Sequence, residues 1–161
     1  ALSTETAPDY AYTRVLLVDD NDLNLQIAEE LMKPYGMQVD CVHSGQEAVD
    51  AVKKERYDLV FMDHMMPGMD GVEALKKIRA LPDKNCCSIP VVVLTANASG
   101  SAQAMYLAEG FSDFLAKPIM LQKLSEILKK WLAPVDEKRR REYRNRRNQK
   151  ADGGQDEKPG K

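Results

Sequence analysis

The stretch VLLVDD at residues 15–20 joins a short apolar run to two adjacent acids, and LVFMD at residues 59–63 repeats that form. If both runs are neighbouring parallel strands, Asp19, Asp20 and Asp63 emerge at the same carboxyl edge of one sheet. In an open α/β sheet that edge is where ligands bind. Three close negative charges require either a bound divalent cation or raised carboxylate pKa values.

The same alternation of apolar runs and helical patterns continues along the chain. We predict strands near 15–18, 38–42, 59–62, 90–95 and 112–116, and helices near 22–34, 45–55, 71–80, 100–109 and 120–132. Five such repeats predict an α/β fold, a doubly wound five-stranded parallel sheet with helices on both faces. Pro34 lies in the last turn of the first helical pattern, so we expect that helix to end early or bend there.

The flanks of this repeat pattern have a different composition. We predict an N-terminal linker over residues 1–13, a single domain over 14–132, and a basic, largely disordered linker or tail over 133–161. Trp131 is expected to anchor the last helix in the core. The tail has almost no apolar residues to bury, so at most a few helical turns are expected from about residue 136, with the final ten residues disordered.

Composition and charge exclude several classes of protein. The chain has 161 residues, of which 43% are hydrophobic, enough for one buried core. It has no apolar run of about 18 residues and no leader pattern, so we expect a cytoplasmic protein without a membrane span. The net charge of −2 hides a basic run over residues 138–150. That run is either a solvated linker or a segment that attracts nucleic acid or anionic lipid. Its single aromatic residue is Tyr143, so we do not expect a nucleic-acid partner.

Two further polar residues stand at the ends of predicted strands. Thr95 ends PVVVLT, and Lys117 follows FLA. A carboxylate nucleophile, a hydroxyl, an ammonium group and a cation site describe phosphoryl transfer, which depends on in-line positioning and on neutralising phosphoryl charge. Asp63 can be the nucleophile, because aspartyl phosphate is an established covalent form. Mg2+ suits the site because it prefers oxygen ligands and keeps several waters.

Four segments in order resemble the receiver domain of two-component response regulators. They are LVDDN at 17–21, FMD at 61–63 with MPGMDG at 66–71, LTANA at 94–98, and FLAKP at 114–118. The resemblance covers residues 14–132 and implies the flavodoxin-like strand order 2-1-3-4-5. It implies a phosphoacceptor rather than an enzyme, with slow self-catalysed loss of phosphate. The donor would be a phosphohistidine on a sensor histidine kinase or a histidine phosphotransfer domain.

The resemblance also assigns roles to individual residues. Asp63 would accept the phosphoryl group, while Asp20 would bind Mg2+ directly and Asp19 mostly through water. The carbonyl of Met65 would be a further Mg2+ ligand, and Asp63 would complete the metal site. Thr95 and Lys117 would contact the phosphoryl oxygens.

A conformational switch is implied as well. Thr95 would move toward the phosphoryl group, and the ring of Phe114 would fill the vacated space; the alternative is that Phe114 is an ordinary core residue. Phe114 lacks the hydroxyl with which a tyrosine could hydrogen-bond. The Lys117–Pro118 bond is cis in many relatives, and we predict cis here.

Finer sequence features concern the parent protein. DDNDLN at 19–24, TANA at 95–98 and GFSDF at 110–114 look more like receivers of hybrid sensor histidine kinases than like those joined to DNA-binding domains. A homodimer could form through the surface of helix 100–109, strand 112–116 and helix 120–132. Alternatives are a pseudo-receiver that acts only as an interaction module, and an aspartyl-phosphate phosphatase. The phosphatase fits poorly, because haloacid-dehalogenase-like enzymes place Asp-x-Asp on a single strand.

Overall fold

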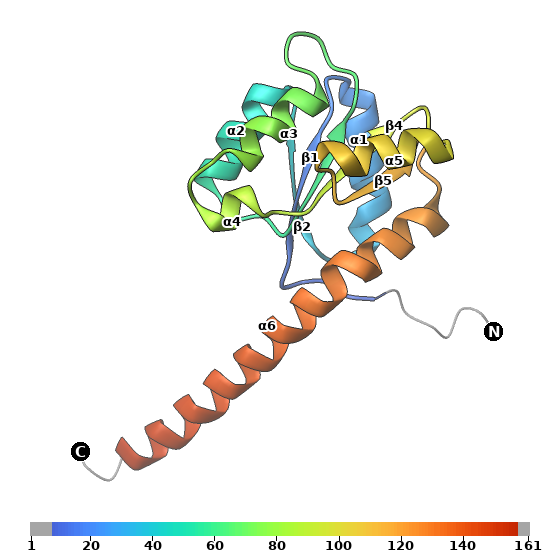
Figure 1. Ribbon diagram of the computed structural model, residues 1–161. Helices are drawn as coiled ribbons and strands as arrows, with labels where there is room; N and C mark the ends of the chain where they lie inside the picture. The colour runs from blue at the N-terminus through green and yellow to red at the C-terminus, as the bar shows by residue number, and fades with distance from the viewer. Residues whose placement is uncertain (1–7, 158–161) are drawn as a thin grey trace, which may run out of the picture.

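The domain is built on a five-stranded parallel sheet with the order β2-β1-β3-β4-β5, as predicted. The computed structural model describes residues 8–157. Figure 1 shows the helices on both sides of the sheet. The strands are β1 Arg14–Val18, β2 Gln38–Val42, β3 Leu59–Asp63, β4 Val91–Thr95 and β5 Asp113–Ala116. The central pair β1 and β3 matches Val18 with Met62, so the residues that follow both strands lie at one edge.

The helices cover the two faces of the sheet unequally. They are α1 Asp22–Met32, the 3-10 helix η2 Lys33–Tyr35, α2 Gly45–Lys54, α3 Gly71–Arg79, the short α4 Lys84–Cys87, α5 Gly100–Glu109 and α6 Leu121–Glu157. Buried residues of α2, α3, α4 and α5 form one core cluster, and those of α1 and α6 form the other. Within β3, Val60 and Met62 join the first cluster, whereas Leu59 and Phe61 join the second. Both faces are buried, so the strand reads as a continuous apolar run.

The helix boundaries follow from local chemistry. The side chains of Asn21, Ser44, Asp70 and Ser99 each accept a hydrogen bond from a backbone N–H of the first turn that follows. α1 ends at Met32, and η2 continues through Pro34 to the left-handed Gly36, so the expected early end at Pro34 is confirmed. α4 was not predicted, because a four-residue helix carries no detectable period.

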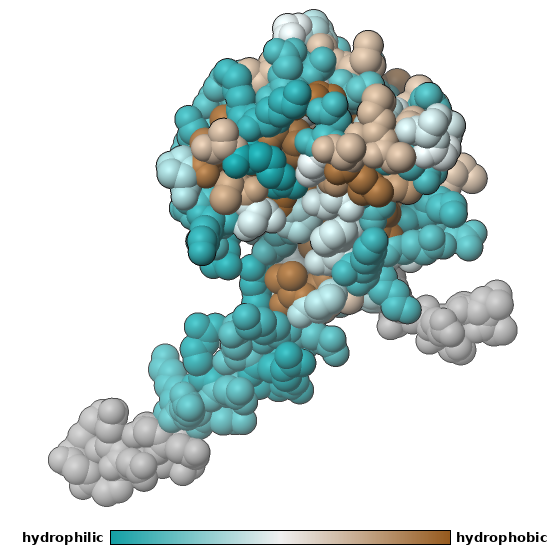
Figure 2. All heavy atoms as spheres, viewed as in Figure 1, coloured by the Kyte–Doolittle hydropathy of each residue, from teal (hydrophilic) through white to brown (hydrophobic). Residues whose placement is uncertain are grey.

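The last helix differs most from the prediction. α6 does not stop near residue 132 but continues through Pro134 to Glu157, and Figure 1 shows it leaving the body of the domain as one long helix. Figure 2 shows that its projecting part is hydrophilic. A few helical turns were expected from about residue 136; the disorder predicted beyond them is corrected to a helix that continues to Glu157, while residues 158–161 lie outside the described residues. Trp131 is only partly buried; its indole N–H donates to Asp113 Oδ2 over 3.0 Å.

Residues 9–13 are not a free linker either. Tyr10 is 4% exposed, and its N–H donates to the carbonyl of Tyr35 over 2.7 Å. The N–H of Tyr12 donates to Asp136 Oδ1 over 2.9 Å, and Asp136 is buried. We call residues 9–13 the N-terminal strap; it lies between the domain and α6 and gives the extended helix polar partners. Of the residues predicted as a linker, 9–13 are therefore part of the folded structure, and 1–7 lie outside the described range.

Candidate functional site

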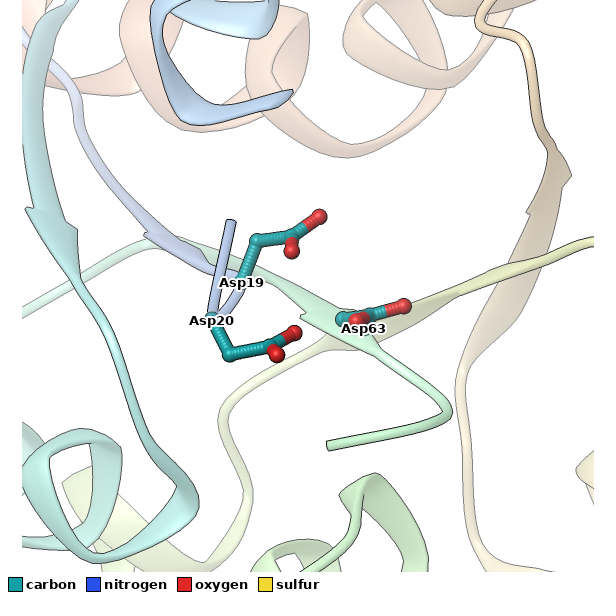
Figure 3. A group of neighbouring side chains, drawn as sticks. All are labelled: Asp19, Asp20 and Asp63. Atoms are coloured by element: carbon teal, nitrogen blue, oxygen red, sulfur yellow. The ribbon is translucent and has the colours of Figure 1, made fainter. Parts of the chain in front are cut away.

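Three carboxylates converge at the carboxyl edge of the sheet, as predicted. Asp19 and Asp20 follow β1, and Asp63 ends β3. One oxygen from each of the three side chains lies within 4.8 Å of the others. Figure 3 shows the three side chains on adjacent strand ends. Asp19 and Asp63 are only 3% and 4% exposed, whereas Asp20 is open to solvent.

Lys117 completes this cluster from the end of β5. Its Nζ lies 2.6 Å from Asp63 Oδ1 and 3.4 Å from Asp19 Oδ2. Burial alone would lower the pKa of Lys117, but the hydrogen bond and charge of Asp63, together with Asp19, raise it above its usual value. The lysine is therefore held as an ammonium ion directly beside Asp63. The peptide bond that follows, Lys117–Pro118, is cis, which confirms the prediction.

The electrostatic balance at Asp63 favours an added cation. Burial raises the pKa of Asp63; the charges of Asp19 and Asp20 add to this effect, and Lys117 opposes it only in part. Hard oxygen donors with surplus negative charge are what Mg2+ requires. The residues present therefore fit a magnesium site made by Asp19, Asp20 and Asp63. Met65 lies two residues after Asp63 and is 74% exposed. Its backbone carbonyl is the further Mg2+ ligand that the resemblance implies.

A glycine lets α3 approach the end of β3. A Cβ on Gly71 would overlap the carbonyl oxygen of Asp63, and the N–H of Gly71 donates to the carbonyl of His64 over 3.0 Å. Asp70, one residue earlier, forms a capping box with Glu73. The segment PGMDG at residues 67–71 therefore positions the Asp63 backbone as well as starting α3.

Thr95 stands at the same edge, but its hydroxyl has other partners. It lies 2.6 Å from the hydroxyl of Tyr106 on α5, and it accepts from the N–H of Asn97 over 3.1 Å. Among the described residues, the Thr95 hydroxyl makes no hydrogen bond with Asp63 or Lys117, although the carbonyl of Thr95 accepts from the N–H of Lys117 over 2.8 Å. Sequence reasoning missed Tyr106, because a tyrosine inside an ordinary helical pattern gives no sign of what its hydroxyl contacts.

Phe114, the predicted switch aromatic, lies on β5. Its side chain is partly buried against the core cluster that contains Tyr106. The structure thus brings Asp19, Asp20, Asp63 and Lys117 into contact distance, with Thr95 and Phe114 close by on neighbouring strands.

This chain is similar to known proteins in sequence and in fold. Residues 15–129 match the family model of the response regulator receiver domain. The chain belongs to this family. The receiver is 44% identical over 119 residues to the sensor protein GacS of Pseudomonas syringae pv. syringae, covering 73% of this chain and 13% of that protein. It is 38% identical over 114 residues to the signal transduction histidine-protein kinase BarA of Escherichia coli K12, covering 71% of this chain and 12% of that kinase. The receiver thus spans about an eighth of the length of these relatives.

Solved structures agree on the fold. The receiver domain of the sensor histidine kinase PA1611 from Pseudomonas aeruginosa PAO1 is 36% identical, with a TM-score of 0.67 over 75% of this chain and 98% of that one. It is described with a magnesium ion coordinated in the active site cleft. A second match is in the co-crystal structure of the Saccharomyces cerevisiae histidine phosphotransfer protein Ypd1 with the receiver domain of Ssk1. It has a TM-score of 0.70 and 29% sequence identity, and it covers 80% of this chain and 92% of the other. In the described part of this receiver, no helix is long and apolar enough to cross a membrane.

Proposed function

We propose that this receiver takes a phosphoryl group from a phosphohistidine onto Asp63, as a module of two-component phosphorelay signalling. The observation that carries the proposal is the geometry at Asp63, where a buried carboxylate contacts Lys117 at 2.6 Å and has two further carboxylates within metal-binding reach. A buried ion pair beside surplus negative charge is costly as a purely structural feature, and it is useful where a phosphoryl group must be bound.

The chemistry follows from the residues. A carboxylate oxygen of Asp63 attacks the phosphorus in line, an O–P bond forms, and the P–N bond to the donor imidazole breaks, leaving a neutral histidine once that nitrogen has taken a proton. Lys117 stays protonated throughout and neutralises charge on the phosphoryl oxygens. Asp19, Asp20, Asp63 and the carbonyl of Met65 would hold Mg2+, which would supply further charge neutralisation when bound. Thr95 donates its hydroxyl to the product, and Phe114 repacks in response. The phosphoryl group is then lost slowly to water.

The comparisons support the choice of partners. Ypd1 and the Ssk1 receiver were crystallised together, and GacS and BarA are sensor kinases, so the donor we propose is a histidine kinase or a histidine phosphotransfer domain. We propose the receiver module of a hybrid sensor kinase in the cytoplasm as the parent context. The surface of α5, β5 and the start of α6 is the proposed homodimer face.

Phosphorylation by acetyl phosphate tests the acceptor. Wild type should gain one phosphoryl group by intact mass when Mg2+ is present, and the adduct should survive acid and be lost in base. Asp63→Asn should gain none, and Asp50→Asn, which changes an exposed aspartate of α2, should behave as wild type. A folded wild type that takes no adduct from acetyl phosphate or from a phosphohistidine donor would indicate a pseudo-receiver. Release of phosphate in large excess over protein would indicate a phosphatase.

A further inference from the structure

The hydroxyl of Thr95 is fully engaged within its own loop. A threonine hydroxyl has one proton and two lone pairs. One lone pair accepts from the N–H of Asn97 over 3.1 Å, and the proton is within reach of the Asn97 carbonyl at 3.2 Å or of the Tyr106 oxygen at 2.6 Å. The Tyr106 hydroxyl can also donate to the Asn97 carbonyl at 3.4 Å. In either arrangement, the proton of Thr95 is used away from Asp63.

Tyr106 is held firmly in this position. It is 2% exposed, and its ring packs edge-on against His64 with centroids 5.2 Å apart and against Phe111 with centroids 6.1 Å apart. His64 directly follows Asp63, so the same ring contacts the phosphoacceptor loop and the Thr95 hydroxyl. Packing on two sides keeps the phenol from following Thr95 if that side chain turns toward Asp63.

We propose that Tyr106 is a positioning residue that holds Thr95 in its resting orientation, so that phosphorylation of Asp63 must break the Tyr106–Thr95 hydrogen bond and thereby acts on α5. The inference rests on the proposed function. Phe114, on β5, has no hydroxyl and cannot hydrogen-bond to Thr95. The hydroxyl that does so belongs to Tyr106 on α5.

The Tyr106–Thr95 hydrogen bond adds a free-energy cost to the movement of Thr95 toward Asp63. Whichever hydroxyl donates, moving Thr95 Oγ1 toward Asp63 separates two buried oxygens that now lie 2.6 Å apart. Without the phenol oxygen, Thr95 keeps its Asn97 partners and leaves no buried group unpaired. Tyr106→Phe should therefore favour the phosphorylated orientation by the net value of one hydrogen bond, about 2- to 10-fold in an equilibrium constant.

The test uses beryllofluoride with Mg2+, because this tetrahedral phosphoryl mimic binds a carboxylate without a donor. Amide resonances of residues 100–109 are followed by NMR in full-length wild type, Tyr106→Phe and Tyr57→Phe. Tyr57 is a matched control: the residue is 6% exposed, and its hydroxyl donates to Asp40 over 2.6 Å in a partly buried contact before the start of β3, at the other end of that strand from Asp63. Its loss removes one tyrosine hydrogen bond without touching Thr95. The beryllofluoride concentration that gives half-saturation is recorded for each protein.

Tyr106→Phe should half-saturate at a concentration about 2- to 10-fold lower than wild type. Before any addition, its α5 resonances should already be displaced toward their beryllofluoride-bound positions. Tyr57→Phe should lose stability but show neither effect. Wild-type affinity or weaker affinity in Tyr106→Phe, with unshifted resonances, would overturn the role of Tyr106 alone. Failure of wild type to bind beryllofluoride would overturn the proposed function and this inference with it.

Discussion

At the scale of single residues, the site is organised around a carboxylate that is costly to ionise. Asp63 is 4% exposed, and its pKa is raised chiefly by burial, with Asp19 and Asp20 adding to the shift. The folded protein therefore keeps the proton of Asp63 in a pH range where the unfolded chain has already released it. Raising the pH through that range removes stability, because the folded state must then carry the extra charge.

Asp63→Asn should remove the cost of ionising this buried carboxylate and leave the other contacts of the fold in place. Without divalent cations, the melting temperatures of wild type and variant should converge near pH 4. At pH 7 the variant should melt at a higher temperature than wild type, because its amide carries no buried negative charge beside Asp19 and Asp20. Adding Mg2+ at pH 7 should raise the wild-type value and close the gap, since a ligand that prefers the folded state stabilises it. A variant less stable than wild type at pH 7 would show that the Lys117 ion pair outweighs the repulsion.

At the scale of elements, the strands and most helices could be predicted from the sequence, but the bonds between elements could not. The Asp and Ser caps act over three residues, so Asp70 and Ser99 indicate helix starts directly. Arg79, by contrast, reads as an ordinary charge on the surface of α3. In the structure, its guanidinium donates to the carbonyls of Ile89, Cys87 and Gly110 at 2.6, 3.0 and 3.1 Å, and burial lowers its pKa. Such partners depend on tertiary packing, which no local pattern records.

The ion pair between α6 and the start of β3 should contribute measurably to stability. Arg139 contacts both carboxylate oxygens of Asp58, at 2.7 and 2.5 Å, and the Asp58 side chain is only 6% exposed. Arg139→Met should cost about 2–3 kcal/mol in the free energy of unfolding by urea. We expect less than the full cost of an orphaned buried charge, because Asp58 keeps the N–H of Arg14 at 2.9 Å and the Arg139 side chain is 30% exposed.

Two comparisons isolate the effect of that pair. Arg141→Met changes an exposed arginine of the same helix and should leave the free energy of unfolding within about 0.5 kcal/mol of wild type. Asp58→Asn combined with Arg139→Met should recover part of the loss, because the amide carries no charge. Equal effects of Arg139→Met and Arg141→Met would mean that the pair adds nothing.

At the scale of the whole molecule, the location of the site followed from the acids at the strand ends and the sheet order from the resemblance, whereas the extent of the folded unit followed from neither. Residues 133–150 have almost no apolar surface, so composition alone predicted disorder. Residues 136–140 are held instead by polar contacts to partners that are remote in sequence. Tyr12 and Asp136, for example, are 124 residues apart, and Arg140 lies over the Tyr12 ring at 5.0 Å. Neither partner could be recognised without the other.

The unit that folds should therefore be longer than the predicted 14–132. A chain of residues 9–141 keeps the N-terminal strap and its α6 partners, and we expect its melting temperature to match that of the full chain. A chain of residues 14–132 loses Tyr10, Asp136 and Arg139, which leaves Asp58 without its cation and uncovers the Tyr35 carbonyl. It should melt about 10 °C lower, since about 3 kcal/mol is lost from a domain of this size. Both chains should still accept one phosphoryl group from acetyl phosphate, because Asp58 and Asp63 stand at opposite ends of β3 and the cluster at Asp63 is intact in each. Equal melting temperatures would show that the strap and the extended helix only rest on the domain.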